Sequence, residues 1–210
     1  MSEEIFKNIG NHYDNLYTKY GFDHKALEYG STLSQEKKFS VISQVCDLEG
    51  MSILDVGCGF GDFYQFLKNK YTQINYEGYE LSEEIQKKAI SNYPNLNISV
   101  KNILEDESNI GETHDIVTGN GIFSLLGENA SELMKKIILA MFNRASYAVA
   151  FTSLSSWSKE KNNEHFADPI ETYKWCSKIS PWVTLRHDYM PHDFTIYIYK
   201  QQRKVNSLKI

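Results

Sequence analysis

Short apolar segments with strand character alternate with longer segments of helical period along most of the chain. The helical segments place apolar residues three and four positions apart, most clearly at Leu133, Met134, Ile137, Ile138, Met141 and Phe142. Buried strands are predicted at 52–56, 75–80, 97–101, 115–119 and 147–152. Alternation of this kind predicts a parallel sheet with helices on both of its faces.

The last part of the chain has a different pattern. Two strand-like runs at 182–190 and 194–200 are separated only by Pro191, His192 and Asp193. Because so short a link cannot hold a crossover helix, these two strands are predicted to be antiparallel. The predicted fold class is therefore α/β, with a doubly wound, Rossmann-like sheet of seven strands that ends in a C-terminal antiparallel hairpin.

Polar positions indicate where helices begin and how the chain is divided. Ser34 is predicted to cap the helix before the first strand, and Ser82 to cap the helix that begins at Glu83. No internal repeat or low-complexity stretch interrupts the 210 residues. We therefore expect one domain over 1–210, with a Rossmann-like core at 34–210 and a tyrosine-rich lid or cap segment at 1–33.

Charge and composition exclude several classes of protein. The chain has 22 Lys and Arg against 27 Asp and Glu, a net charge of -5, which disfavours nucleic acid as a partner. The sequence has no apolar run long enough to span a bilayer and no secretory leader at its start, so no membrane partner and a cytoplasmic location are expected. Its cysteines, Cys46, Cys58 and Cys176, lack metal-ligand spacing, and no metal is expected. The sequence carries no signal for oligomeric state.

A glycine-rich turn follows the first predicted strand. Residues 53–63 read Ile-Leu-Asp-Val-Gly-Cys-Gly-Phe-Gly-Asp-Phe, an apolar strand that runs into Gly57, Gly59 and Gly61 and then into a helix. Glycines allow a tight turn and a close approach of the backbone to a ligand. The alternative interpretation is a tight turn that binds nothing.

Two acidic residues favour a ligand at this turn. Glu80 ends the second strand 23 residues after Gly57, the spacing at which an acid meets the hydroxyl pair of a ribose. Asp55 lies two residues before Gly57, where it would repel the pyrophosphate of a dinucleotide but tolerate a cationic sulfonium. The pattern therefore indicates a cofactor that contains a ribose and favours one with a positive charge.

The sequences Asp-Val-Gly-Cys-Gly-Phe-Gly-Asp at 55–62 and Tyr-Glu-Leu-Ser at 79–82 resemble the first two signature motifs of class I S-adenosylmethionine (SAM) methyltransferases. The resemblance implies SAM as cofactor and assigns regions to it. The 55–62 loop would cradle the methionine portion, Glu80 the ribose hydroxyls, 102–103 the adenine edge and 120–121 the wall beside the methyl group. An Asp is commoner in the family than Asn102. The cofactor-binding residues implied are Asp55, Gly57, Cys58, Gly59, Gly61, Asp62, Glu80, Leu81, Asn102, Ile103, Asn120 and Gly121.

Candidates for the methyl acceptor's site lie outside these motifs. The opening segment is rich in aromatic residues with polar tips, which could cover a cofactor site and contact the acceptor, and its candidates are Tyr13, Tyr17, Tyr29 and Gln35. The alternative is a helix that packs on the sheet edge. The charged loop at 153–168 follows the fifth strand and is a second candidate to close over the acceptor, or a solvated connection.

The terminal hairpin is unusually polar. Strict alternation along its first strand would place His187 and Tyr189 on one face, so both could point at one site. The candidate catalytic residues are therefore His187, His192 and Tyr189, with Arg186 as an acceptor-binding residue. The alternative is a hairpin turn that is polar because it is exposed.

Three further segments extend the resemblance: Gly-Ile-Phe-Ser at 121–124, Phe-Thr-Ser-Leu-Ser-Ser-Trp at 151–157 and the polar run at 186–195. They are similar to small bacterial O-methyltransferases of natural-product and surface-glycan pathways, including phosphonate O-methyltransferases. This resemblance implies transfer to an oxygen of a small polar, anionic metabolite that carries a phosphate, phosphonate, sugar or carboxylate group. Arg186, His187, Tyr189 and His192 would then bind the anion.

Other functions remain open at this point. An N-methyltransferase of a small amine keeps the cofactor and changes the acceptor. An NAD-dependent oxidoreductase is disfavoured by Asp55 and by the spacing of the glycines, which is Gly-x-Gly-x-Gly rather than Gly-x-Gly-x-x-Gly. A binding module that keeps the fold without turnover is a third alternative.

Overall fold

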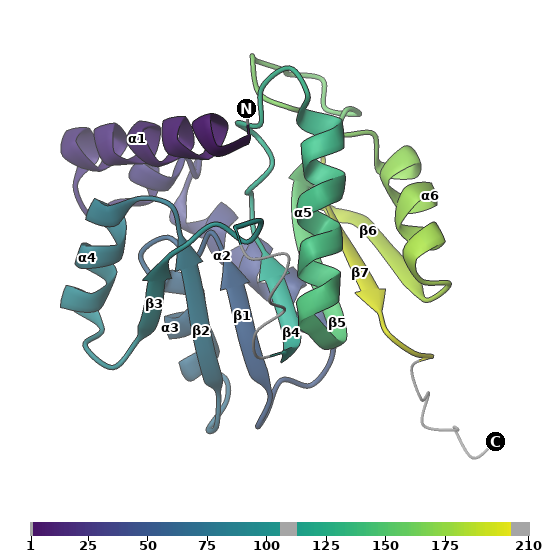
Figure 1. Cartoon of the computed structure of the whole chain (residues 1–210), viewed down its shortest axis with the longest axis horizontal. Coiled ribbons are helices and arrows are strands. Elements are labelled where there is room, and N and C mark those ends of the chain that lie inside the picture. Colours follow the sequence, from purple (N-terminus) through teal and green to yellow (C-terminus); the bar gives the residue numbers. More distant parts are fainter. Residues whose placement is uncertain (1, 106–112, 203–210) are drawn as a thin grey trace.

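The computed structural model describes residues 2–105 and 113–202. Its centre is a seven-stranded sheet with the strand order β3-β2-β1-β4-β5-β7-β6 (Figure 1). The strands are β1 (Ser52–Val56), β2 (Asn75–Glu80), β3 (Asn97–Val100), β4 (His114–Gly119), β5 (Ala145–Leu154), β6 (Val183–Met190) and β7 (Asp193–Tyr199). β1 to β5 are parallel, and β7 pairs antiparallel with both β5 and β6. The predicted fold class is confirmed.

Helices cover both faces of the sheet. They are α1 (Ser2–Tyr20), α2 (Thr32–Ile42), α3 (Asp62–Lys68), α4 (Glu83–Asn92), α5 (Ala130–Arg144) and α6 (Pro169–Ile179), with short 3-10 helices η1 (His24–Leu27) and η2 (Ser43–Val45). One apolar core lies between the sheet and α5 and includes Leu133, Ile137 and Met141. The core on the other face includes Phe39 of α2 and Phe63 of α3.

β7 joins these two cores because its side chains alternate between them. Phe194, Ile196 and Ile198 belong to the α5 core, whereas Tyr197 and Tyr199 belong to the α2 core. The hydroxyls of both tyrosines donate to carbonyl oxygens at the end of α2 and in η2, over 2.5 Å from Tyr197 and 2.9 Å from Tyr199. These bonds fix α2 against the sheet.

Helix caps agree only in part with the sequence prediction. Ser82 caps α4 as predicted, because its hydroxyl accepts a hydrogen bond of 3.0 Å from the Ile85 amide. The cap of α2 is Ser31 rather than Ser34, and its hydroxyl accepts from the Ser34 amide over 3.1 Å. Ser34 accepts in return from the Ser31 amide, which completes a capping box. The predicted start of this helix was wrong because two serines three residues apart both take part in the cap.

α1 lies across the sheet above β2 and β3 (Figure 1). Gly10 makes this packing possible, because a Cβ there would lie only 2.8 Å from the Leu81 carbonyl oxygen just after β2. The Ser82 hydroxyl also donates to the carboxylate of Asp14. Both contacts hold α1 at the edge where the parallel strands end. Among the helices that the structure describes, none is long and apolar enough to cross a membrane.

Candidate functional site

A cavity opens at the carboxyl ends of β1, β2 and β4, where ligands bind in open α/β sheets. Four loops that follow strands form its floor, with residues 55–59, 79–81, 101–103 and 120–125. Further walls come from α1, from the segment before α2, from α2 itself, from the end of β5 and the loop after it, and from the start of β7. Their lining residues are Phe6, Ile9, Tyr13, Leu27, Glu28, Tyr29, Lys38, Phe39, Ser153, Leu154, Glu164 and Asp193.

The turn after β1 needs its glycines. Gly57, Gly59 and Gly61 have φ angles of 70°, 56° and 80°, a region that side chains with a Cβ rarely adopt. A Cβ on Gly57 would also lie 2.5 Å from a methyl carbon of Ile122. The amides of Gly57 and Cys58 donate to the Tyr79 carbonyl over 2.8 and 3.0 Å, which ties the turn to β2. Burial raises the pKa of the Cys58 thiol, so this cysteine stays a neutral packing residue.

Glu80 connects the β1 and β2 loops. One carboxylate oxygen accepts from the Gly59 amide over 2.8 Å, and the other accepts from the Leu81 and Ser82 amides over 2.8 and 3.0 Å. Burial raises the pKa of Glu80, while these three backbone donors act against that rise. A carboxylate has about four lone-pair positions, so capacity remains for a hydroxyl of a bound ligand.

Asp55 lies below the glycine turn and is buried. Its two oxygens accept hydrogen bonds of 2.6 Å each, from the Tyr76 and Thr118 hydroxyls. Burial nevertheless raises the pKa of Asp55 to about 6, and the nearby charge of Glu80 adds to this rise. A positive ligand in the cavity would stabilise its ionised form.

The buried charge of Asp55 predicts a measurable pH dependence of stability. The pKa is about 6 in the folded protein against an ordinary value of 3.8, so the folded state binds the proton more tightly. The contribution of Asp55 to the free energy of unfolding is therefore fully present below its ordinary pKa. It is lost as the pH rises through the pKa that Asp55 has in the folded protein. With about 1.4 kcal/mol for each pKa unit, the loss is about 3 kcal/mol. We expect the free energy of unfolding of Asp55→Asn, measured with urea, to rise by about 3 kcal/mol relative to that of wild type between about pH 4 and pH 7. Equal changes in the two proteins over this range would contradict the prediction.

The predicted cofactor-binding residues gather at the cavity with two exceptions. Those that line it are Asp55, Gly57, Cys58, Gly59, Glu80, Leu81, Asn102, Ile103, Asn120 and Gly121. Gly61 and Asp62 lie behind this wall, where Gly61 precedes α3 and Asp62 begins it. The Asp62 carboxylate accepts a hydrogen bond of 2.9 Å from the Gln35 side chain. Gln35 therefore contacts the glycine turn's far end rather than the cavity.

The predicted aromatic residues of the opening segment divide in a similar way. Tyr13 and Tyr29 line the cavity, whereas Tyr17 packs on Phe60 with ring centroids 5.7 Å apart. The pKa of Tyr13 is raised by burial and by the neighbouring acids Glu28, Glu80 and Glu164. The Tyr29 hydroxyl accepts a hydrogen bond of 2.8 Å from the Asn120 side chain.

The hairpin does not place His187 and Tyr189 on one face, and this prediction was wrong. The His187 ring lies beside Phe194 and Trp157, and its Nε2 is 2.8 Å from the Ser155 hydroxyl. The Tyr189 hydroxyl instead reaches Asp193 of β7, whose side chain lies on the opposite face from that of Phe194. The register between β6 and β7 shifts between Arg186 and Met190, so strict alternation fails there.

None of the four predicted hairpin residues lines the described cavity. The Arg186 guanidinium binds the exposed Asp188 over 2.8 and 2.9 Å and Gln44 over 3.1 Å. His192 contributes its carbonyl oxygen, which accepts from the Ser155 amide over 3.0 Å. The reason is the strand order: β7 lies between β5 and β6, which makes β6 the outer strand and moves its side chains away from β1 and β4.

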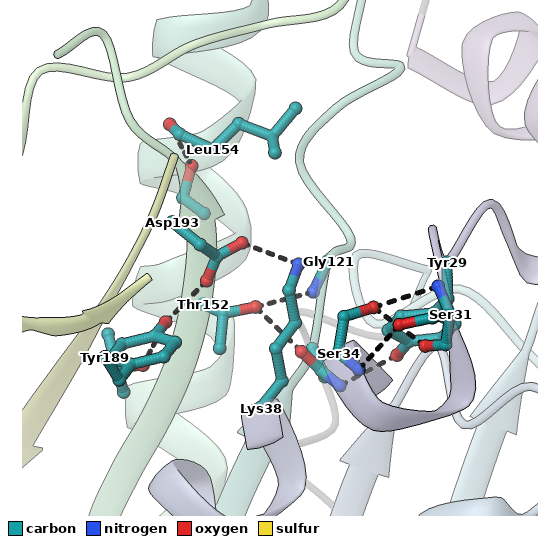
Figure 2. Close-up of polar contacts among 12 residues, drawn as sticks. Tyr29, Ser31, Ser34, Lys38, Gly121, Thr152, Leu154, Tyr189 and Asp193 are labelled. Atoms are coloured by element: carbon teal, nitrogen blue, oxygen red, sulfur yellow. Dashed lines mark hydrogen bonds and ion pairs between the residues drawn. The ribbon is translucent and has the colours of Figure 1, made fainter. Parts of the chain in front are cut away.

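Several residues at the cavity were missed by the sequence prediction, and two of them form an ion pair. Lys38 of α2 points to Asp193 of β7, and its Nζ lies 2.6 Å from a carboxylate oxygen (Figure 2). Both side chains are buried, and Asp193 is wholly so. The helical period of α2 contained a signal, since Gln35, Lys38, Phe39 and Ile42 all lie on its buried side.

Acidic groups outnumber basic groups around the cavity. The acids are Asp55, Glu80, Glu28, Glu164 and Asp193, and the bases are Lys38 and Lys101. Lys38 is paired with Asp193, and the Lys101 ammonium lies 5.1 Å from the centre of the Tyr79 ring. A cavity with this balance favours a positively charged ligand. Within the described part of the chain, no group of three or more His, Cys, Asp or Glu residues could hold a metal ion.

The sheet order, the glycine turn and the acid at the end of β2 define a protein of the Rossmann-like α/β class. Residues 47–205 match the methyltransferase domain family, and the chain belongs to that family. A protein of Mycobacterium tuberculosis with a provisional methyltransferase name is 29% identical over 160 residues, which cover 71% of this chain and 93% of that protein.

Solved structures show the same fold. Magnesium protoporphyrin IX methyltransferase of Synechocystis PCC 6803, with bound S-adenosylhomocysteine (SAH), has a TM-score of 0.65 at 11% identity and covers 94% of this chain and 100% of its own. The DhpI-SAM-HEP complex has a TM-score of 0.66 at 11% identity and covers 89% of this chain and 94% of its own. At these identities the likeness concerns the fold alone.

Proposed function

We propose that this methyltransferase uses SAM and transfers the methyl group to an oxygen of a small polar acceptor. The observation that carries the proposal is the joint position of the glycine turn and Glu80 at one acid-rich cavity. Proteins of similar fold bind SAM or SAH, as their structures record. The acid excess suits the sulfonium of SAM, which is positive, and suits SAH less, because its sulfur is neutral.

The residues present fit the cofactor. The turn at Gly57 and Gly59 offers backbone without Cβ atoms, and Glu80 keeps lone-pair capacity for a ribose hydroxyl. Asn102 and Ile103 would border the adenine, and Asn120 and Gly121 the reacting methyl group. When bound, SAM supplies a methyl group that is already activated. The chain's own contribution is to orient the acceptor oxygen and to exclude water. In this proposal 1–33 forms a cap over the site.

An amine acceptor is the second candidate, and one observation favours it. Glu28 and Glu164 both line the cavity and both act on the pKa of Tyr13, and two acids beside one cavity attract a cation, although Glu28 also contacts the His12 ring over 3.1 Å. The hairpin residues that suggested an anionic acceptor lie elsewhere, which leaves Lys38 as the cation toward β5 and β7. An oxygen acceptor would be bound at Lys38, whereas an amine would be bound at the two glutamates.

Calorimetric titration tests the cofactor, and methyl transfer tests the acceptor. SAM and SAH should bind saturably and NAD should not. Transfer of labelled methyl from SAM is then measured on matched phosphate, phosphonate, sugar, carboxylate and amine compounds. Binding of NAD alone would contradict the cofactor proposal, and transfer to amines alone would replace the oxygen acceptor by the second candidate.

A further inference from the structure

We infer that Lys38 binds an anionic oxygen of the acceptor, and that Asp193 holds the Lys38 ammonium in place for this contact. The acceptor class is then a small molecule with a carboxylate, phosphate or phosphonate group. The inference rests on the proposed methyltransferase function and names the acceptor contact that the hairpin residues do not provide.

Lys38 has unused capacity to donate hydrogen bonds at the cavity. An ammonium carries three N–H donors, and the structure gives Lys38 one polar partner within 2–105 and 113–202, the Asp193 carboxylate at 2.6 Å. The ring of Tyr29 lies 5.8 Å from the same Nζ. Since a buried ammonium without partners is costly, two free donors at a cavity wall indicate a ligand that accepts them.

Asp193 is held too tightly to be the group that meets the acceptor. Its first oxygen accepts from the Tyr189 hydroxyl over 2.5 Å, and its second contacts Lys38. Tyr189 is fixed in turn by Thr195, whose hydroxyl lies 2.8 Å from the Tyr189 hydroxyl. The Asp193 side chain is fully buried, so a ligand reaches Lys38 before Asp193. Tyr189 and Asp193 are therefore positioning residues, and Lys38 is the contact.

The charges around the cavity separate a site for a cation from a site for an anion. The acids that raise the pKa of Tyr13 are Glu28, Glu80 and Glu164. Asp193 is not among the causes of the Tyr13 shift; after burial it raises the pKa of Tyr189, and its own charge is balanced by Lys38 over 2.6 Å. A cationic cofactor is favoured beside the three glutamates, and an oxyanion is favoured beside Lys38, where an ammonium forms strong charge-assisted bonds.

Binding of simple oxyanions to the SAH-loaded protein tests the inference. The probes are methylphosphonate, inorganic phosphate and acetate, titrated with calorimetric detection. The variants are Lys38→Met, Lys38→Arg and the control Lys68→Met at an exposed position of α3. At least one probe should bind saturably, with affinity about tenfold or more lower in Lys38→Met, retained in part in Lys38→Arg and unchanged in the control.

A second variant guards against misfolding. Lys38→Met leaves the Asp193 carboxylate buried without its cation, whereas Lys38→Met with Asp193→Asn removes both charges and keeps a partner for Tyr189. The double variant should bind SAH with the affinity of wild type and should no longer bind the oxyanion. Equal oxyanion binding in wild type and in the double variant, or no oxyanion binding to the wild-type SAH complex, would overturn the inference. Failure of wild type to bind SAH would instead contradict the proposed function.

Discussion

Replacing Glu80 by alanine is expected to lower the affinity for SAH about 100-fold or more. The carboxylate accepts from the amides of Gly59, Leu81 and Ser82, so its loss frees three backbone donors and removes the side-chain link between the β1 loop and β2. A hydrogen bond to a charged group contributes about 1.5 to 3 kcal/mol, so loss of the bond to the ligand, together with the loosened β1 loop, accounts for the effect. Isothermal titration calorimetry measures it directly.

Two variants make this experiment specific. Glu80→Gln keeps the shape and one acceptor oxygen, so it should retain an intermediate affinity. Glu84→Ala removes an exposed acid from the first turn of α4 and should leave the SAH affinity unchanged. Circular dichroism melting of the ligand-free variants separates a local effect from unfolding. Wild-type affinity in a folded Glu80→Ala protein would remove Glu80 from the cofactor site.

The second large effect concerns stability at the hairpin. Asp193→Ala should lower the free energy of unfolding by about 3 to 5 kcal/mol, because it leaves the Lys38 ammonium buried without its partner. It also takes the acceptor from the Tyr189 hydroxyl. Asp188→Ala on β6 is the matched control, since Asp188 also pairs with a base but is 62% exposed. Its expected cost is about 1 kcal/mol or less. Urea unfolding compares the two.

A double substitution tests the physical reason. Lys38→Met combined with Asp193→Ala removes both charges, and most of the lost stability should return because no buried charge stays unpaired. Equal destabilisation by Asp193→Ala and Asp188→Ala would show that the buried pair has no special weight. Loss of stability in the double variant equal to the sum of two single losses would show that Lys38 and Asp193 act independently.

The sequence predicted the sheet well because its signals are local. β1 and β2 were predicted at the bounds they have, 52–56 and 75–80, since each combines an apolar run with a turn or a cap at its end. The hairpin of β6 and β7 followed from the length of its link. The clustering of Gly57, Gly59 and Glu80 at one cavity also followed, because carboxyl ends of parallel strands share an edge.

The acceptor region could not be predicted in the same way. The irregular register near Met190 places the side chains of His187 and Tyr189 on different faces of the sheet. A prediction that assumes strict alternation along a strand cannot anticipate such an irregularity. The Lys38 and Asp193 pair joins α2 to β7, elements far apart in the chain. Residue types in the hairpin suggested an anion site, but only the strand order decides that β6 is the outer strand.

The packing of α1 couples occupancy of the cavity to the order of the chain's first helix. Phe6, Ile9 and Tyr13 touch the cavity only while Gly10 rests on Leu81. Any ligand that contacts those side chains binds the protein more tightly when α1 is docked than when it is detached. Ligand binding therefore raises the free energy needed to detach α1. At a concentration 100 times its dissociation constant the addition is about 2.7 kcal/mol. Amide protons of α1 thereby become a reporter of whether the active site is filled.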